Sequence, residues 1–372
     1  MGTVDDSLYL KSQVLTYIGN KRKLLNVIEE AILIISNALK KEKLITLDLF
    51  SGSGIIARLF KRYSKTIIAN DLEGYSYLIN NCYLADKDEL DIDLFNSYLK
   101  DINSHISSNP ITGLISKHYS PLDDNNIKEN ERVFYTNENA IYIDSYRYYV
   151  DKLVPLSYQK FFLAPLLVEA SIHVNTCGIF KGYYKDKKTG IGIFGGSNEN
   201  NLDRIKGKIN IEAPILSNYN CEYIVYKEDA NKLVNSLPVV DVAYLDPPYN
   251  EHPYGSNYFM LNVILENKIK GELSEVAGIP SSWNRSNYNR KKTAYKSLHS
   301  LIKKLKARYI LVSYNDEGFI SFLEMKDMLS SFGELEIRNI PYITFKGCRN
   351  LANRNIHTHE YLFILKKNEY ND

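Results

Sequence analysis

Residues 44–71 read LITLDLFSGSGIIARLFKRYSKTIIAND, and this stretch predicts the fold of the chain. Its first seven residues form a short apolar run, which is typical of a buried strand, and a glycine-rich turn follows. Residues 55–63 carry apolar side chains at helical spacing, and residues 66–69 form a second apolar run. The stretch therefore predicts a β-turn-α-β unit whose second strand ends in an Asn-Asp pair at Asp71.

The same alternation of helices and buried strands recurs elsewhere in the chain. Apolar residues at helical spacing predict a helix at residues 24–39. Further strands are predicted at residues 223–226, 239–245, 309–313 and 361–365, and further helices at residues 293–305 and 320–332. The first three of these strands have polar residues at their carboxyl ends. The pattern implies an α/β fold with a doubly wound, Rossmann-like sheet, whose crevice lies at the carboxyl ends of the strands.

The middle of the chain is less regular. It contains acidic and Asn-rich stretches, aromatic clusters and a Gly/Lys segment, with one amphipathic run near residues 160–174. We therefore expect residues 1–80 and 221–372 to form the sheet domain, and residues 81–220 to be an inserted region.

Bulk composition limits the classes of protein that the chain can belong to. The 372 residues are 44% hydrophobic and 24% charged, and no apolar run approaches the roughly 20 residues of a membrane helix. The first twelve residues are polar without a basic start, so we expect a cytoplasmic protein with no membrane partner. A net charge of +2 excludes a histone-like polycation but allows a local basic face.

The cysteines and histidines predict no metal site. The four cysteines Cys82, Cys177, Cys221 and Cys348 lie far apart without CxxC spacing, so free thiols are expected rather than a zinc site or a disulfide framework. His357 and His359 are two residues apart and His252 stands alone, which favours surface or DNA contact over metal binding.

The glycine-rich turn at residues 48–54, Asp-Leu-Phe-Ser-Gly-Ser-Gly, is the first candidate for chemistry. Glycines after a strand let the backbone approach a ligand, and many βα turns also carry glycine for packing alone. Asp71 follows about twenty residues later, where nucleotide-binding folds place an acid that holds ribose hydroxyls. A lone Asp after a strand is commonly a helix cap, so the pair of features is the stronger signal.

The second candidate is Asp246-Pro247-Pro248-Tyr249, which directly follows a predicted strand. Consecutive prolines fix the backbone and leave carbonyls free of competing amide hydrogens, while the carboxylate stands at the strand end. Such a turn can accept hydrogen bonds from an amino group, and the aromatic ring can stack on a planar base. The alternative interpretation is a rigid structural turn.

The two motifs together resemble those of the Dam-like N6-adenine-specific DNA methyltransferases. In that family an aromatic residue and a lysine precede the glycine-rich turn, and residues 17–23, Tyr-Ile-Gly-Asn-Lys-Arg-Lys, occupy that place. Residues 175–184 and 313–316 are looser matches. The resemblance implies an S-adenosylmethionine-dependent methyltransferase fold with a target-recognition region at residues 81–220. It also implies methyl transfer to N6 of adenine in double-stranded DNA by base flipping.

The resemblance carries over to individual residues. It implies that the cofactor is bound by Tyr17, Lys21, Asp48, Phe50, Ser51, Gly52, Gly54, Asp71 and Asp229, the last of these near the cofactor's adenine. It implies that catalysis depends on Asp246, Pro247, Pro248 and Tyr249, with Asp246 and Pro247 accepting the two amine hydrogens and Tyr249 stacking on the base. Two departures, Leu49 for the common proline and Tyr17 for the common tryptophan, remove no functional group.

Candidate DNA contacts are cations with aromatic or amide neighbours. They are Lys181, Tyr183 and Tyr184 in one segment and Arg285 and Lys291 in another, although charge runs are commonly only solvated. Asn198, Asn200, Asn201 and Arg204 are weaker candidates for reading base edges. The resemblance further implies a bacterial cytoplasmic enzyme of a restriction-modification system, whose restriction endonuclease is a genetic rather than a physical partner.

Four alternatives remain at this point. A cytosine N4 methyltransferase shares the chemistry but more often carries Ser in place of Asp246. RNA or protein-glutamine methyltransferases have a related turn but usually lack a segment like residues 17–23. A non-catalytic DNA-binding or cofactor-sensing subunit is disfavoured by the intact Asp246 and Asp71. A nucleotide-binding oxidoreductase is disfavoured by the missing third glycine of its fingerprint.

Overall fold

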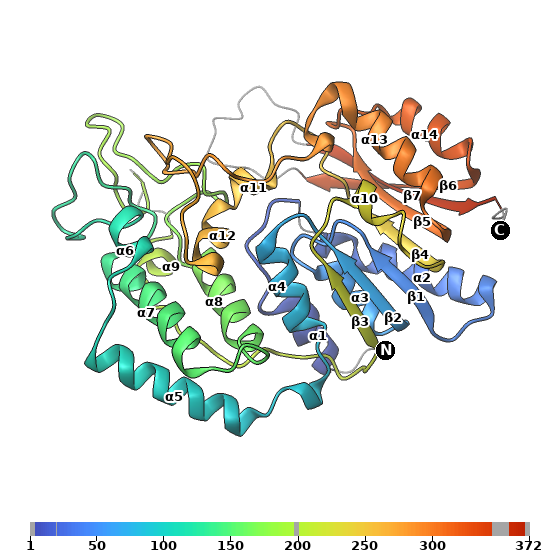
Figure 1. Cartoon of the computed structure of the whole chain (residues 1–372). Helices are drawn as coiled ribbons and strands as arrows, with labels where there is room; N and C mark the ends of the chain where they lie inside the picture. Colours follow the sequence, from blue (N-terminus) through green and yellow to red (C-terminus); the bar gives the residue numbers. More distant parts are fainter. Residues whose placement is uncertain (1–3, 20, 197–200, 344–356, 369–372) are drawn as a thin grey trace.

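The computed structural model describes residues 4–19, 21–196, 201–343 and 357–368 (Figure 1). Within these ranges the strands form one seven-stranded sheet of order β3-β2-β1-β4-β5-β7-β6. The strands are β1 (Leu44–Asp48), β2 (Ser64–Asn70), β3 (Glu222–Tyr226), β4 (Val240–Leu245), β5 (Ala307–Asn315), β6 (Gly333–Ile343) and β7 (His357–Lys367). The first five are parallel, and β7 is antiparallel to both β5 and β6. The predicted mainly parallel α/β sheet is confirmed.

Helices cover both faces of the sheet, as a doubly wound fold requires (Figure 1). Helices α2 (Leu25–Leu39) and α3 (Ile55–Lys61) pack on one face, and α10 (Ala230–Leu233), α13 (Lys291–Lys304) and α14 (Phe322–Ser330) pack on the other. Successive strand side chains alternate between the two clusters: Ile67 joins the α2/α3 side and Ile68 the α13/α14 side. Both faces are buried, which explains why these strands are continuous apolar runs in the sequence.

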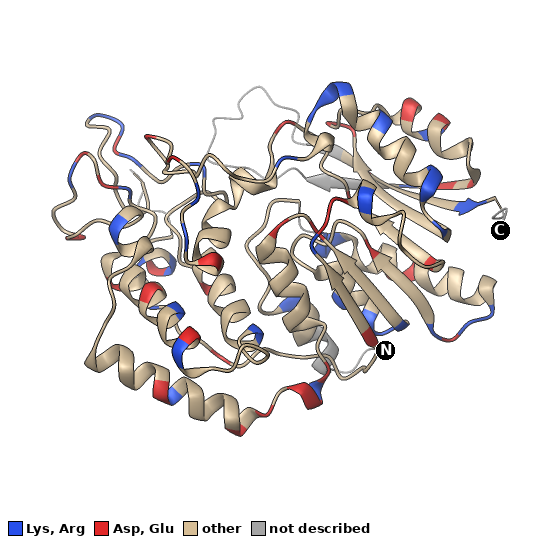
Figure 2. Ribbon diagram, in the orientation of Figure 1, with Lys and Arg blue, Asp and Glu red and all other residues tan. Residues whose placement is uncertain are grey.

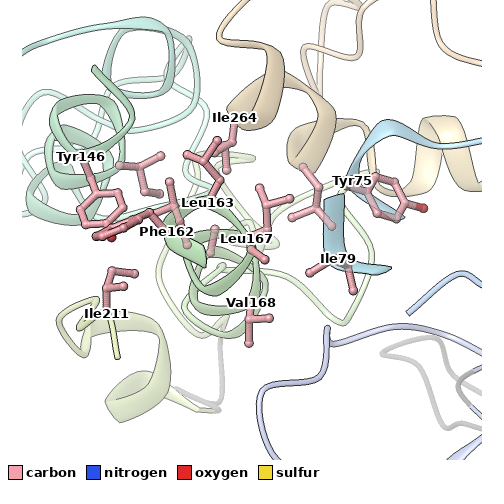
Figure 3. Close-up of a cluster of buried hydrophobic side chains, with 14 of the residues drawn as sticks. Tyr75, Ile79, Tyr146, Phe162, Leu163, Leu167, Val168, Ile211 and Ile264 are labelled. Atoms are coloured by element: carbon pink, nitrogen blue, oxygen red, sulfur yellow. The ribbon is translucent and has the colours of Figure 1, made fainter. Parts of the chain in front are cut away.

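A helical half lies beside the sheet, and Tyr223 of β3 packs against its core. Its helices are α4 (Gly74–Tyr83), α5 (Ile92–Ser108), α6 (Leu114–His118), α7 (Asn137–Leu153), α8 (Lys160–Ile172), α9 (Leu202–Lys206), α11 (Tyr254–Asn257) and α12 (Phe259–Glu266), while α1 (Val4–Lys11) packs near α3. Figure 3 shows Tyr75 and Ile79 of α4 in one cluster with Phe162 and Leu167 of α8 and with Ile264 of α12. Residues 81–220 thus pack directly on elements outside that range. Their boundaries as a target-recognition region stay a prediction.

Three local expectations need correction. The helix near residues 160–174 is present as α8, but it is not amphipathic, because α4, α7 and α12 surround it and bury Phe161 to Val168 completely. The middle region is more regular than expected, since α5 and α7 each span 17 residues. Strand β6 was not expected at all. It is an edge strand that pairs only with β7, so its exposed residues are polar or charged and its described part lacks a buried apolar run.

The described ranges contain three of the four cysteines. Cys82 and Cys221 are buried free thiols, whereas Cys177 is disulfide-bonded, so the expectation of free thiols is wrong for that residue. Spacing along the chain does not reveal which cysteines the fold brings together. Cys348 lies outside the described residues. No group of three metal-ligating side chains and no helix with the length and apolarity for a bilayer occurs among the residues described.

Candidate active site

A pocket with about 820 Å³ of empty space, part of it open to solvent, lies at the carboxyl ends of the parallel strands. This is where open α/β sheets bind ligands. Predicted site residues that line it are Tyr17, Lys21, Asp48, Phe50, Ser51, Gly52, Asp71, Asp246 and Pro248. Other predicted residues, namely Gly54, Asp229, Pro247 and Tyr249, adjoin the lining residues without bordering the pocket. The fold thus brings together the three motifs that the sequence separates.

The glycine-rich turn is fixed in a shape that only glycine adopts easily. Gly52 and Gly54 have φ angles of +50° and +76°, and a Cβ on Gly54 would lie 2.9 Å from Oδ1 of Asn80. The backbone N–H of Gly52 donates to Oδ2 of Asp71 at 2.8 Å. Asp71 also accepts from the N–H of Glu73 through Oδ1 at 2.9 Å. Asp71 therefore holds the turn in place as well as lining the pocket.

Asp48 is a buried carboxylate without a well-formed hydrogen bond from the protein. It ends β1, is 1% exposed, and neither oxygen accepts a hydrogen bond from the described protein atoms. Burial, together with the nearby carboxylates of Asp246 and Asp71, raises the pKa of Asp48 well above its usual value, while the nearby backbone N–H groups of Ala57 and Phe50 oppose part of this rise. Because buried polar groups are nearly always paired, this one is available to a donor or a cation in the pocket.

The Asp-Pro-Pro-Tyr turn leaves β4 and places Asp246 at the pocket. The N–H of Phe319 donates to the carbonyl of Tyr249 at 2.9 Å, and the Tyr249 ring lies edge-on to Tyr314 with centroids 6.1 Å apart. The Asp246 side chain remains 20% exposed. Burial raises the pKa of Asp246 to about 6, with Lys21 opposing this shift and Glu360 adding to it. The carboxylate is therefore ionised at neutral pH and accessible to a substrate.

The segment before the glycine-rich turn contacts both that turn and the Asp-Pro-Pro-Tyr turn. The Tyr17 ring stacks on Tyr254 and Tyr258, with centroids 5.0 and 4.5 Å away, and it lies against Gly52. Lys21 was expected on the cofactor side, yet its Nζ lies 3.0 Å from Oδ1 of Asp246. Lys21 is thus joined to the Asp-Pro-Pro-Tyr turn. No local pattern around Lys21 predicts this contact.

Asp229 is the N-cap residue of α10, a role that was not predicted from the sequence. Its Oδ1 caps α10 by accepting from the N–H groups of Asn231 and Lys232 at 2.9 and 3.1 Å. Its neighbours Glu228 and Ala230 line the pocket instead. A role for Asp229 at the cofactor adenine stays a prediction.

Several pocket residues were missed by sequence reasoning. Glu73, Asn284, Ser286 and Asn289 line the pocket, the last three from the loop that connects α12 to α13. The side chain of Asn284 donates to the carbonyl of Leu72 and to Glu73 Oε2, both at 3.2 Å. Burial and the charge of Asp71 raise the pKa of Glu73 to about 7. The Asn/Ser-rich composition of this loop was the available signal, and it was attributed only to DNA contact.

The predicted DNA contacts differ in accessibility. Arg285 and Lys291 are exposed, and the Arg285 guanidinium lies 4.3 Å from the centroid of the Trp283 ring. Tyr183 and Tyr184 are half-buried beside Phe194 and Val133, with Lys181 adjacent and also half-buried. Lys and Arg are interspersed with acids over both halves of the molecule rather than gathered in one patch (Figure 2).

Arg204 is not free to read bases. Its guanidinium donates to the carbonyl oxygens of Ile172 and Val174, at the end of α8. Basic groups commonly bind the unpaired carbonyls that a helix leaves at its carboxyl end. Asn201 is exposed, and Asn198 and Asn200 lie outside the described residues.

The sheet order, the glycine-rich turn and the acid-lined pocket at the strand ends define a Rossmann-like methyltransferase. A family profile of the D12 class N6 adenine-specific DNA methyltransferases matches residues 17–328. The chain belongs to this family, and its enzymatic activity is therefore adenine-specific DNA methylation.

Named relatives agree with this assignment. Type II methyltransferase M.NlaIII of Neisseria lactamica is 31% identical over 95% of this chain and 99% of its own length. Type II methyltransferase M.CviAII of Paramecium bursaria Chlorella virus 1 is 32% identical over 94% of this chain and 97% of its own. Type II methyltransferase M.FokI of Planomicrobium okeanokoites is 28% identical over 94% of this chain but 52% of its own.

Proposed function

We propose that the pocket binds S-adenosylmethionine and that Asp246 presents the N6 amine of a flipped-out adenine in double-stranded DNA to it. The observation that carries the proposal is that the Asp246 carboxylate borders the same pocket as the unpartnered Asp48 and the glycine-rich turn. One pocket can then hold the methyl donor while the target amine approaches at its rim.

The pocket residues fit this cofactor. S-adenosylmethionine supplies an electrophilic methyl group on a positively charged sulfur, and it also carries an ammonium group. The unpaired Asp48 carboxylate suits such a cation, and the left-handed glycines let the turn pack closely against Tyr17 and Asn80 at the pocket. Asp71 presents its carboxylate to the pocket for ribose hydroxyls, and the Phe50 ring offers an apolar surface.

Asp246 and Pro247 supply the acceptors that the target amine needs. An aromatic amine is a weak nucleophile because its lone pair is delocalised into the ring. Two acceptors that take its hydrogens favour a pyramidal nitrogen and direct the lone pair toward the donor, so positioning provides much of the rate. Asp246 is ionised at neutral pH, because its pKa is about 6. Tyr249 stacks on the base, whose extrusion from the duplex costs a few kcal/mol.

DNA binding is assigned to exposed cations close to the pocket. Arg285 stands beside Asn284 and Ser286, which line the pocket, and Lys291 begins α13. Lys181, Tyr183 and Tyr184 form a second contact, and residues 81–220 recognise the target sequence. The enzyme then methylates DNA in the bacterial cytoplasm, as part of a restriction-modification system.

The catalytic proposal is tested by incubating DNA with labelled S-adenosylmethionine and analysing the nucleosides. We expect label in N6-methyladenine, and a loss of at least a hundredfold for the isosteric variant Asp246→Asn. Full activity of that variant would contradict the role of Asp246. An Asp241→Asn variant provides a buried aspartate on the same strand that lies outside the pocket.

The DNA contacts are tested by the salt dependence of binding. Arg285→Ala and Lys291→Ala should each weaken binding and reduce the slope of log K against log salt by about one. Lys65→Ala should leave the slope unchanged, because Lys65 is exposed near the amino end of β2, whereas the pocket lies at the carboxyl ends of the strands. If all three variants showed the same slope, the assignment of Arg285 and Lys291 to DNA contact would be wrong.

A further inference from the structure

Lys21 bridges two carboxylates that come from different parts of the fold. Its Nζ lies 3.0 Å from Oδ1 of Asp246 and 3.2 Å from Oε1 of Glu360 on β7. The same Glu360 oxygen accepts a hydrogen bond of 2.8 Å from the hydroxyl of Ser313 on β5. Lys21, Glu360 and Ser313 are all buried. Glu360 is therefore fixed by two partners and does not border the pocket.

The charges of this arrangement do not cancel. One ammonium faces two carboxylates, so the group carries one net negative charge at the edge of the pocket. With Lys21 and Asp246 alone, the pair would be neutral and the lysine would neutralise the acceptor of the substrate amine. When an amine attacks a methyl group, positive charge develops on its nitrogen, and a fixed negative charge beside it stabilises the transition state.

We infer that Glu360 is a positioning residue for methyl transfer: by sharing Lys21, it leaves Asp246 with an uncompensated negative charge for the target amine. The inference rests on the proposed role of Asp246. Glu360 has no contact with substrate in this scheme and acts through Lys21.

The surroundings of Asp246 make the effect of Glu360 measurable. The other ionisable groups that face Asp246 are Lys21, Asp48, Tyr244, Tyr249 and Tyr254. Burial raises the pKa of each tyrosine, so they stay neutral in the working range. Although burial alone would lower the pKa of Lys21, Asp246 and Glu360 raise it well above its usual value, so Lys21 stays charged. Glu360 itself contributes to the raised pKa of Asp246.

The experiment is the pH profile of kcat/KM for DNA methylation, which reports ionisations of the free enzyme. Glu360→Gln removes the charge and keeps the shape. Its maximal rate should fall about tenfold, and its acidic limb should move down by about one pH unit, because the charge that raises the pKa of Asp246 is gone. Glu360→Asp keeps the charge, so it should restore part of the rate and should move the acidic limb back toward its original pH.

Lys21→Met provides a second test in the opposite direction. Without the ammonium, two carboxylates remain together, so the acidic limb should move to higher pH. The matched control is Glu334→Gln, because Glu334 is an exposed glutamate on β6 that pairs with Lys366 of β7, the strand that carries Glu360. Its profile should match that of the unmodified enzyme.

Two outcomes separate this inference from the proposed function. If Asp246→Asn is inactive but Glu360→Gln lowers the rate with an unmoved acidic limb, Glu360 is merely structural and the inference is overturned. If Asp246→Asn keeps full activity, the proposed role of Asp246 fails first. Thermal unfolding of each variant confirms that the compared proteins are folded.

Discussion

Replacing Asp48 with Asn should stabilise the free protein and weaken cofactor binding. Asp48 is 1% exposed, and neither of its oxygens has a hydrogen-bond partner among the described atoms. A buried polar group without a partner costs about 1–3 kcal/mol, and more if it is charged. The folded-state pKa of Asp48 is raised, so this cost grows as pH rises above the unfolded pKa. Asn removes the charge, so we expect a gain of about 1–3 kcal/mol at pH 8.

The same substitution removes the partner that we propose for the cofactor's cation. A charge-assisted hydrogen bond contributes about 1.5–3 kcal/mol, which corresponds to a roughly 10- to 100-fold loss of affinity for S-adenosylmethionine. Stability thus rises while binding falls, which is the trade-off expected of a binding group held without its ligand.

Two measurements check this prediction at pH 8. Denaturant unfolding without ligand gives the change in stability, and calorimetric titration with S-adenosylmethionine gives the affinity. Asp241→Asn is the control, because Asp241 is equally buried but bonds Lys41 at 2.6 Å and the N–H of Ile45 at 2.9 Å. That variant should lose stability and keep its affinity. An Asp48→Asn protein that binds the cofactor within twofold of the original, or that is destabilised, would refute the reasoning.

Three further predictions follow from the pocket. The rate of methyl transfer should fall about tenfold per pH unit below pH 6, because Asp246 must be ionised and its pKa is about 6; a flat kcat/KM profile down to pH 5 would contradict this. Glu73→Gln should stabilise the protein by about 2–3 kcal/mol at pH 8 and very little at pH 4. Because the pKa of Glu73 is raised to about 7 in the folded state, stability is lost as pH rises from the unfolded pKa of about 4.5 to about 7, and the loss is complete at pH 8; equal unfolding midpoints at pH 8 would disprove the idea. Gly54→Ala should lower the free energy of unfolding by at least about 1–2 kcal/mol, because the φ of Gly54 is +76° and the new Cβ would lie 2.9 Å from Asn80. In thermal unfolding the control is Gly182→Ala, because no atom lies within 4 Å of the Cβ that it would add.

Local patterns were sufficient for most of the sheet. A buried parallel strand is an apolar run followed by turn residues, so β1, β2, β4 and β5 could be located within a few residues. Strand β6 escaped prediction because an edge strand is only half covered and alternates charged with apolar residues. The burial of α8 escaped for the opposite reason, since helices distant in sequence enclose it.

The pocket could be predicted only where a motif carries its own chemistry. The turns at Asp48 and Asp246 have local signatures, because glycine and proline fix backbone shape wherever they stand. Glu73 and the loop residue Asn284 have no such signature. They line the pocket because α12 and the loop after it fold back over the end of β2.

Local sequence patterns were enough to predict the sheet except for β6, as well as its two turns, and hence the family to which the chain belongs. The partners of those turns became clear only from the three-dimensional packing. Lys21 meets Asp246 and Glu360 because β7 inserts antiparallel between β5 and β6, which brings a carboxylate from the end of the chain beside a lysine from its start. Such contacts depend on strand register and on packing between distant segments, and no short-range pattern encodes them.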